Sequence, residues 1–343
     1  MTRTQAGSPA LTVVAESYSM IWNAVAVDRG RVFVSGPRWS GSKGPPLARL
    51  DEHGAPVAYP NDAWNGWRNG DDPSQAFVNV NAIHRDDAGN LWVIDTGSPA
   101  FGGDPLPGGA KVVRIDLGTD AVSRVYPLGP EVARKGSYVD DIRLHGACGF
   151  LTDAGQAGII VLDLTSGAAR RVLDGHPAAT APEDRPIVVA GETLLAPDGS
   201  RLRVNSDPLE VSPDGRWFYF GPLEGPWVRI ETRYLEDPSL SAAQLASKVE
   251  PWADLPPIGG AAMDTNGDLY FTDLAESALK RRAVDGTITT LVRDPNLHWV
   301  DAPFIDDDHS VWLPVPQLDR AALFHGGRSE IQWPIRLYRF PLG

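Results

Sequence analysis

One short pattern recurs along this 343-residue chain and restricts its fold more than any other feature. Each copy has an apolar stretch, a turn of Asp, Asn and Gly, and a second stretch that begins with a large apolar or aromatic residue. Clear copies lie at residues 86–95, 212–220, 264–273 and 306–314, and degenerate copies at residues 27–36 and 144–153. Because self-similarity along a chain is the signature of repeated supersecondary units, the sequence predicts six similar modules.

The turns within each module predict β-hairpins. Asp, Asn and Gly between apolar or alternating stretches favour tight turns. A second alternating pair of stretches follows several copies, at residues 111–128, 158–173 and 278–292. The 35 glycines and 30 prolines also argue against long helices. Two hairpins per module give a four-stranded sheet, and six such sheets arranged radially form an all-β, six-bladed β-propeller.

We expect the whole chain, residues 1–343, to form this propeller as a single domain. The segment 11–18 is expected to close the ring by pairing with residues 336–340 in the last blade. The blades are predicted at about residues 21–70, 76–128, 137–175, 185–235, 255–293 and 298–343.

Two further features interrupt the blade pattern. One short exterior helix is predicted to begin at Asp237 and Pro238 and to end before Pro251, since Pro is favoured at the first helical position. Insertions rich in Gly, Pro and Asn lie at residues 36–46, 60–75 and 98–110. Long loops on a rigid scaffold are candidates for the rim of a channel mouth, or for flexible surface excursions.

The charge of the chain argues against several classes of partner. The 31 Lys and Arg residues and 44 Asp and Glu residues give a net charge of −13 with no basic stripe, which disfavours nucleic acids and anionic membranes. The apolar run at residues 11–14 is too short for a secretory signal, and no stretch approaches the roughly 20 apolar residues of a membrane span. Cys148, the only cysteine, forms no disulfide framework. We expect a monomer that binds a small molecule and is cytoplasmic, or an exported protein that is already processed.

Several linked motifs follow one another in the order of a known family. A Pro-Arg-Trp segment leads to Ala58-Tyr59-Pro60, and the stretch VNVNAIHRDDAGNLWVIDTG follows at residues 78–97. With KVVRIDL, SYVDDIRL and LEVSPDGRWFYFGPL further on, the chain resembles the major royal jelly protein and Yellow family. The resemblance implies a six-bladed propeller. It leaves the function open, because members include dopachrome-converting enzymes, binders of small ligands and secreted nutritional proteins.

A more distant resemblance connects the chain to the senescence-marker and gluconolactonase propellers. Those proteins use Glu, Asn and Asp side chains at the channel to hold a divalent metal and to open sugar lactones. The resemblance implies that similar side chains line the channel of this chain.

The first strand of each predicted blade lines the axis, so polar residues within these apolar stretches are the candidate site. They are Asn23, Asn79, Asn81, Asp140, Asp141, Glu210 and Asp301. Four of them supply the oxygen ligands that Ca²⁺ or Mg²⁺ prefers, namely Asn81, Asp140, Glu210 and Asp301. The sequence predicts such a divalent cation and no organic cofactor. The alternative is that these side chains bind backbone N–H groups and join the blades.

Candidate catalytic and substrate-binding residues complete the set. His298, close to Asp301, is the histidine expected to act as acid or base, together with Asp301 and Glu210. No Ser nucleophile or phosphate-loop motif is present in the sequence. An aromatic and partly cationic rim is expected to bind substrate with Asn81, unless its rings fold down onto the blades. It consists of Arg38, Trp39, Trp64 and Trp299.

Three functions follow as hypotheses. The first is an enzyme that opens or hydrolyses a lactone-like molecule with the help of a metal ion. The second is a metal-free isomerase or lyase that acts on aromatic quinone-type substrates. The third is a non-catalytic binding protein for small aromatic or amine ligands, for which an anionic channel is suited.

Overall fold

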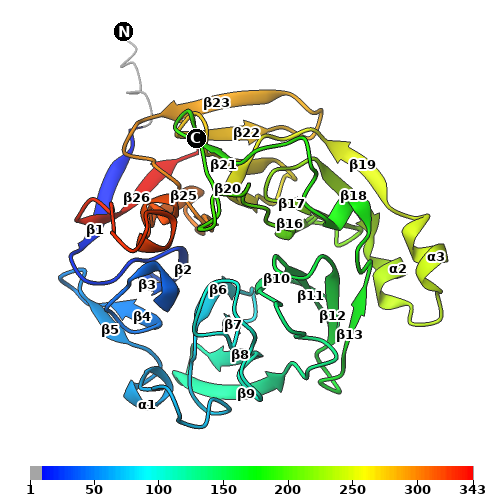
Figure 1. Cartoon of the computed structure of the whole chain (residues 1–343), viewed down its shortest axis with the longest axis horizontal. Helices are drawn as coiled ribbons and strands as arrows, with labels where there is room; N and C mark the ends of the chain where they lie inside the picture. The colour runs from blue at the N-terminus through cyan, green and yellow to red at the C-terminus, as the bar shows by residue number, and fades with distance from the viewer. Residues whose placement is uncertain (1–9, 343) are drawn as a thin grey trace, which may run out of the picture.

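The computed structural model describes residues 10–342, and in it six four-stranded antiparallel sheets surround a central axis (Figure 1). This arrangement confirms the predicted all-β, six-bladed propeller. The first blade contains β2 (Ala24–Asp28), β3 (Arg31–Ser35), β4 (Leu47–Leu50) and β5 (Pro56–Ala58). The second contains β6 (Val80–Arg85), β7 (Asn90–Asp95), β8 (Lys111–Asp116) and β9 (Ala121–Pro127).

The next three blades repeat this order from the axis outward. The third contains β10 (Val139–His145), β11 (Cys148–Asp153), β12 (Ile159–Asp163) and β13 (Ala169–Val172). The fourth contains β16 (Ser206–Val211), β17 (Trp217–Pro222), β18 (Trp227–Glu231) and β19 (Glu250–Ala253). The fifth contains β20 (Ile258–Met263), β21 (Leu269–Asp273), β22 (Ala278–Arg282) and β23 (Ile288–Arg293).

The sixth blade joins the two ends of the described chain. Its three inner strands are β24 (Phe304–Ile305), β25 (Ser310–Val315) and β26 (Ile335–Pro341), and its outermost strand is β1 (Thr12–Ser17). Strands β1 and β26 are antiparallel, with Val13 opposite Tyr338 and Glu16 opposite Arg336. The ring is therefore closed by backbone hydrogen bonds between the first and last strands.

The recurring turn in the sequence has a structural reason. In three blades, the aspartate that begins the turn accepts a hydrogen bond from an aromatic side chain six residues later. The bonds are Trp92 Nε1 to Asp86 (2.8 Å), Trp312 Nε1 to Asp306 (2.7 Å) and Tyr270 Oη to Asp264 (3.4 Å). Each carboxylate also accepts backbone N–H groups of its own turn. The pattern thus fixes each hairpin to the strand that follows it.

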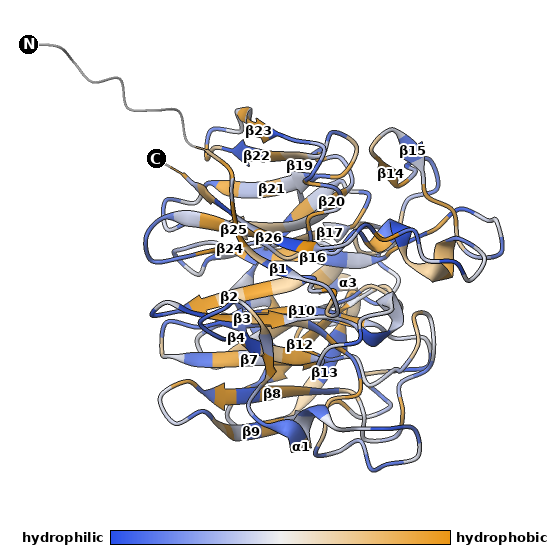
Figure 2. Ribbon diagram, turned by 90° about the vertical axis from the view of Figure 1, so that its left-hand side faces the viewer, coloured by the Kyte–Doolittle hydropathy of each residue, from blue (hydrophilic) through white to orange (hydrophobic). Residues whose placement is uncertain are grey.

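Hydrophobic residues concentrate in the strands, and hydrophilic residues predominate in the connecting loops (Figure 2). Neighbouring blades bury these side chains against one another. Ile94 and Val112 of the second blade, for example, belong to the same buried cluster as Leu151 and Ile160 of the third. Burial of this apolar surface supplies the main driving force for folding.

The predicted exterior helix is two helices, which corrects the sequence prediction. They are α2 (Thr232–Glu236) and α3 (Ala242–Ala246), and Asp237 and Pro238 lie between them rather than at a helix start. The Asp237 carboxylate accepts a hydrogen bond from Ser239 N, which forms a turn, and Ser241 caps α3 through a capping box with Gln244. A third short helix, α1 (Asp62–Asn65), was not predicted. None of the helices between residues 10 and 342 is long and apolar enough to cross a membrane.

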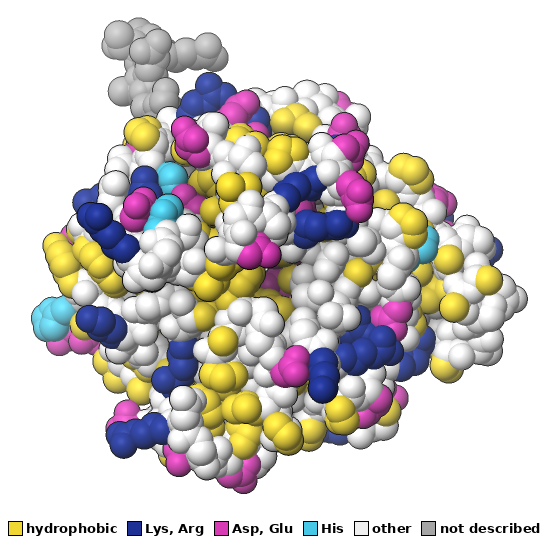
Figure 3. Space-filling model, viewed as in Figure 1, with side chains coloured by type: hydrophobic (Ala, Val, Ile, Leu, Met, Phe, Trp, Pro, Cys, Tyr) yellow, Lys and Arg dark blue, Asp and Glu magenta, His cyan; other side chains and the backbone are white. Residues whose placement is uncertain are grey.

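Long connections meet at one end of the channel. The first and third predicted insertions contribute the turn η1 (Arg38–Ser40) and Phe101. Two connections that the sequence did not single out also contribute. One links β13 to β16 and carries β14 (Val188–Val189) and β15 (Glu192–Thr193), and the other links β25 to β26 and carries η3 (Leu318–Arg320) and η4 (Ala322–Phe324). Hydrophobic side chains gather around the hollowed centre of this face (Figure 3).

Candidate functional site

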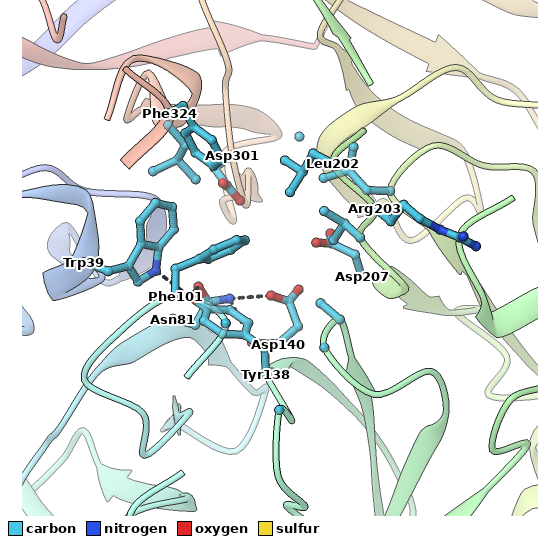
Figure 4. A pocket seen from close by; sticks show the side chains of 18 of the residues that line it. Trp39, Asn81, Phe101, Tyr138, Asp140, Leu202, Arg203, Asp207, Asp301 and Phe324 are labelled. Carbon is cyan, nitrogen blue, oxygen red and sulfur yellow. Dashed lines mark hydrogen bonds between the residues drawn. The ribbon is translucent and has the colours of Figure 1, made fainter. Parts of the chain in front are cut away.

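A cavity of about 370 Å³ lies at this end of the channel. Aromatic side chains form much of its wall, and acidic and amide side chains lie at its base (Figure 4). The aromatic residues are Trp39, Phe101, Tyr138, Trp299 and Phe324. The polar residues at the base are Asn81, Asp140, Asp207 and Asp301. A largely apolar cavity with a few convergent polar groups is typical of small-molecule sites.

Equivalent irregularities in the innermost strands position these polar side chains. The pairing of β6, β10 and β16 with the next strand shifts at Asn81, at Asp140 and Asp141, and at Asp207 and Pro208. The same shift occurs in β20 at Gly259 and Gly260, which offer no side chain. A β-bulge breaks the regular alternation of a strand and redirects a side chain. Bulges in consecutive blades therefore position Asn81, Asp140 and Asp207, whereas Asp301 lies in the connection that precedes β24.

A chain of hydrogen bonds connects the aromatic wall to the base. Trp39 Nε1 donates to Tyr138 Oη (2.9 Å), and the Tyr138 hydroxyl donates to Asn81 Oδ1 (2.8 Å). Asn81 Nδ2 in turn donates to Asp140 Oδ1 (2.5 Å). These bonds hold four side chains of the site in one geometry.

Asp301 is the carboxyl group at the base of the cavity that can exchange a proton near neutral pH. Burial, with a smaller contribution from the negative charge of Asp141, raises the pKa of Asp301 to about 7, although two donated hydrogen bonds oppose the shift. The donors are the backbone N–H of Ala302 (2.8 Å) and Nε1 of Trp299 (3.3 Å). A group with such a pKa can both release and accept a proton near pH 7.

Asp140 and Asp207 are the other two carboxyl groups at the base that have a raised pKa. Burial raises the pKa of both carboxyl groups well above the ordinary range, and the charges of neighbouring carboxylates add to the effect. Asn81 donates to Asp140, whereas no side chain or backbone group among residues 10–342 donates a hydrogen bond to the Asp207 carboxylate. Asp207 is thus the carboxyl group left free to contact a ligand.

Among the described residues, no cationic side chain balances these acids within the cavity. Arg203 belongs to the lining, but its guanidinium points away from the carboxylates (Figure 4) and binds the backbone oxygen of Ala181 and the carboxylate of Glu183. The cavity therefore disfavours anionic ligands and accepts uncharged or cationic ones.

Glu210 lies apart from the other predicted metal ligands. It faces a second cavity of about 890 Å³, at the other end of the channel, beyond a constriction of about 20 Å³. There Arg143 donates two hydrogen bonds to Glu210 (2.8 and 3.1 Å) and one to Asp141 (2.7 Å). Glu210 is three residues beyond the bulge at Asp207, which places it further along the channel.

The structure therefore brings together three of the four predicted metal ligands, Asn81, Asp140 and Asp301, and adds Asp207. The Asn81 amide oxygen already accepts the Tyr138 hydroxyl. Among the described residues, no group of three or more His, Cys, Asp or Glu side chains is arranged to hold a metal ion. The residues at the base do not fit the predicted cation site in this geometry.

The other predicted residues divide between the cavity and the surrounding fold. Trp39 and Trp299 line the cavity, and their role in binding substrate stays a prediction. Trp64 instead packs against Phe77, and the Arg38 guanidinium binds the backbone oxygen of Asn65 and lies over Trp67. These contacts match the alternative in which such side chains fold down onto the blades.

His298 is close to the cavity in sequence but is not part of its lining. Its Nε2 bonds to a carboxylate oxygen of Asp319 in η3 (2.8 Å), and the side chain is buried. Asn79 also serves the fold, because its side chain accepts the backbone N–H of Arg38 and donates to Thr96. Neither residue is placed to touch a ligand in the cavity.

Asp207, Phe101, Tyr138 and Phe324 are the site residues that the sequence reasoning missed. A signal for Asp207 was present, because Asp207 precedes Glu210 by the same three residues that separate Asp140 from Arg143. Phe101 and Phe324 lie in irregular connections, where no local pattern indicates which side chains meet.

Comparison with known proteins agrees with this architecture. Residues 78–319 match the family model described as major royal jelly protein. The chain belongs to this family. A search of curated protein sequences found no match.

Solved structures similar to this family member share its fold at low sequence identity. Virginiamycin B lyase from Staphylococcus aureus is 12% identical, with a TM-score of 0.56 and coverage of 98% of this chain and 100% of that one. A gluconolactonase from Xanthomonas campestris is 12% identical, with a TM-score of 0.57 and coverage of 98% and 90%. A Bacteroides thetaiotaomicron protein of unknown function is 10% identical, with a TM-score of 0.59 and coverage of 97% and 76%.

Proposed function

We propose that this chain is a small-molecule enzyme whose carboxyl groups catalyse proton transfer at the channel mouth, as an isomerase or lyase does. The observation that carries the proposal is the presence of three buried carboxyl groups, Asp140, Asp207 and Asp301, at the base of one aromatic cavity. Groups of like charge that share a site cannot all ionise, so some keep a proton while another gives it up.

The different pKa shifts assign roles to these groups. Isomerisation and elimination both need a base that removes a proton and an acid that supplies one. Asp301, with a pKa of about 7, is the base, and Asp207, whose pKa burial and neighbouring carboxylates raise well above its ordinary range, is the acid. Asp140 is held by Asn81 and orients the polar edge of the substrate.

The cavity also limits the substrate. Its aromatic wall favours a molecule with a flat apolar face, and its uncompensated acids favour a molecule without negative charge. A volume of about 370 Å³ suits a compact ligand of one or two rings. Aromatic quinone-type compounds meet these conditions, and a lactone-like ring opened by the same carboxyl groups is the alternative.

The names of the similar structures support an enzyme more than any single reaction. Propellers of this fold are named as a lyase and as a gluconolactonase. Fold similarity at 12% identity does not select between them, so the choice rests on the donor set in the cavity. That set supplies protonated and ionised carboxyl groups and lacks Glu210, on which the predicted cation site depended.

An assay of purified protein tests the proposal. Aromatic quinone-type compounds and sugar lactones are offered as substrates, with and without EDTA. We expect turnover that survives chelation and falls by about 100-fold or more in Asp301→Asn, because a general base typically contributes that much. Asp308→Asn, which changes an exposed turn carboxyl group, is the control.

Two results would contradict the proposal. Turnover that EDTA abolishes and Ca²⁺ or Mg²⁺ restores would establish metal-assisted chemistry instead. Equal turnover by Asp301→Asn and the wild type would remove the assigned base.

A second function has its own supporting observation. Three acids without a cationic partner, enclosed by aromatic rings, also form a suitable site for a small aromatic amine, which would be bound without reaction. Calorimetry with an arylalkylamine distinguishes the two. Tight binding that is lost in Asp207→Asn, with no product formed, would favour the binding protein.

A further inference from the structure

Phe101 occupies an unusual place in the cavity. Its ring projects into the middle of the space, where three other aromatic rings surround it (Figure 4). The ring centroids lie 4.8 Å from Trp39, 5.8 Å from Tyr138 and 6.0 Å from Phe324. These separations fall within the range of 4.5–7 Å that favours aromatic pairs. The three surrounding rings therefore form a subsite that already holds one six-membered planar ring.

The four rings differ in how they are anchored. Trp39 and Tyr138 belong to the hydrogen-bond chain that ends at Asp140, and their positions are fixed by polar bonds. Phe101 has no polar side-chain atom, so only contacts with aromatic rings and other apolar side chains hold its side chain. The backbone next to it is Gly102, with φ of +70°, and Gly103. Glycine gives a chain more conformational freedom than any other residue.

Bonds on both sides of this short segment hold the rest of the loop. The Ser98 hydroxyl donates to the Ala100 backbone oxygen (2.8 Å), and the Asp104 carboxylate accepts the backbone N–H of Gly136 (2.9 Å). A movement of Phe101 can thus be confined to the residues between Ala100 and Asp104. The loop need not unfold for the ring to leave.

We propose that Phe101 is a plug that reserves this ring subsite and that a planar six-membered ring of the ligand displaces it. The position that Phe101 vacates lies between Trp39, Tyr138 and Phe324 and beside Asn81. A ring bound there would present its polar edge to the base of the cavity. This inference rests on the proposed function for the identity of the site and adds the residue that determines which ligands enter.

The proposal has a measurable thermodynamic consequence. If a ligand must displace Phe101, the apparent affinity of the ligand is its affinity for the empty subsite multiplied by the fraction of molecules in which the subsite is empty. Removal of the plug should therefore strengthen the binding of planar rings. A saturated ring of the same size fits poorly between aromatic faces and should gain less.

The experiment compares phenol and cyclohexanol binding by calorimetry and tryptophan fluorescence in wild type, Phe101→Ala and Phe101→Leu. We expect the Kd for phenol to fall about tenfold or more in Phe101→Ala, with little change for cyclohexanol. Phe101→Leu restores most of the bulk and should behave like the wild type. The test measures binding of phenol and not turnover, so failure of the catalytic proposal would not affect it.

A second measurement uses the unaltered loop. With 4-fluorophenylalanine at position 101, saturating phenol should shift the ¹⁹F resonance toward that of the denatured chain. Phenol binding to Phe101→Ala that equals or falls below wild-type binding, in protein with an unchanged unfolding midpoint, would overturn the proposal. A ¹⁹F resonance that does not move when phenol is bound would do the same.

Discussion

At the scale of single residues, the acids in the cavity reduce stability in the range of pH where they are reactive. The Asp301 carboxyl group has an ordinary pKa of 3.8, which applies to the unfolded chain, and a pKa of about 7 in the folded protein. The folded state therefore binds a proton that the unfolded state has already released. The stabilisation that proton binding at Asp301 gives the folded state is complete below about pH 3.8 and is lost as the pH rises through 7.

Asp301→Asn removes this penalty because an amide does not ionise. We expect the variant to be more stable than the wild type at pH 8 by about 2 kcal/mol, after allowance for partial exposure of the group, and to lose that advantage at pH 4. Urea unfolding at both pH values measures the difference. An advantage of the same size at pH 4 and pH 8 would show that titration of Asp301 is not its cause.

Single residues also show how far the sequence could predict the site. Asn81, Asp140 and Asp301 were found because a polar residue within an apolar inner strand needs a partner. Asp207 was missed and Glu210 chosen in its place, because strict alternation does not reveal a bulge. The bulge at Asp207 shifts the phase of the strand, and which of the two carboxylates reaches the cavity depends on it.

At the scale of the elements, the turn and the following strand form a unit that the sequence predicts well. The aspartate and the aromatic residue lie six positions apart, and the hydrogen bond between them is made within one hairpin. Such local bonds do not depend on the rest of the fold. The connections that cover the cavity depend on the rest of the fold, since Phe101 contacts Phe324 only when the ring of blades has formed.

Trp92→Phe tests the contribution of this bond. The substitution keeps an aromatic ring but leaves the Asp86 carboxylate without its donor at 2.8 Å. Trp227→Phe is a matched control, because Trp227 is equally buried and its Nε1 has no partner among the described residues. We expect Trp92→Phe to lower the free energy of unfolding by about 1–2 kcal/mol more than the control. Equal losses in urea unfolding would mean that the bond contributes nothing to stability.

At the scale of the whole molecule, closure of the ring depends on a pairing that spans the described chain. The sequence indicated six modules, because each carries its own turn signal. It indicated the pairing of segment 11–18 with residues 336–340 from the general need to close a ring and from the strand pattern, since the pairing of β1 with β26 joins residues with no local relation. In the structure, β1 covers the outer edge of β26, which would otherwise expose its backbone groups.

Deletion of residues 1–17 tests this dependence. Loss of β1 leaves the outer edge of β26 unpaired, although β25 still pairs with its inner edge, and removes the ion pair between Glu16 and Arg336. We expect the Tm to fall by about 10 °C or more and the protein to aggregate more readily. Tyr18→Ala, at an exposed side chain just beyond the strand, is the control and should leave the Tm unchanged. A truncated protein with the wild-type Tm would contradict a structural role for β1.

The same pairing determines when the propeller can finish folding during synthesis. Strand β1 leaves the ribosome before the other described strands and β26 leaves it after them, so β1 stays without its partner until all the strands between them have been synthesised. The other five blades can form as they are translated, whereas the sixth lacks the pairing between β1 and β26 until β26 has been synthesised. A chain cut short by premature termination would therefore keep an open ring and an unpaired first strand, which gives the cell a feature by which unfinished copies differ from complete ones.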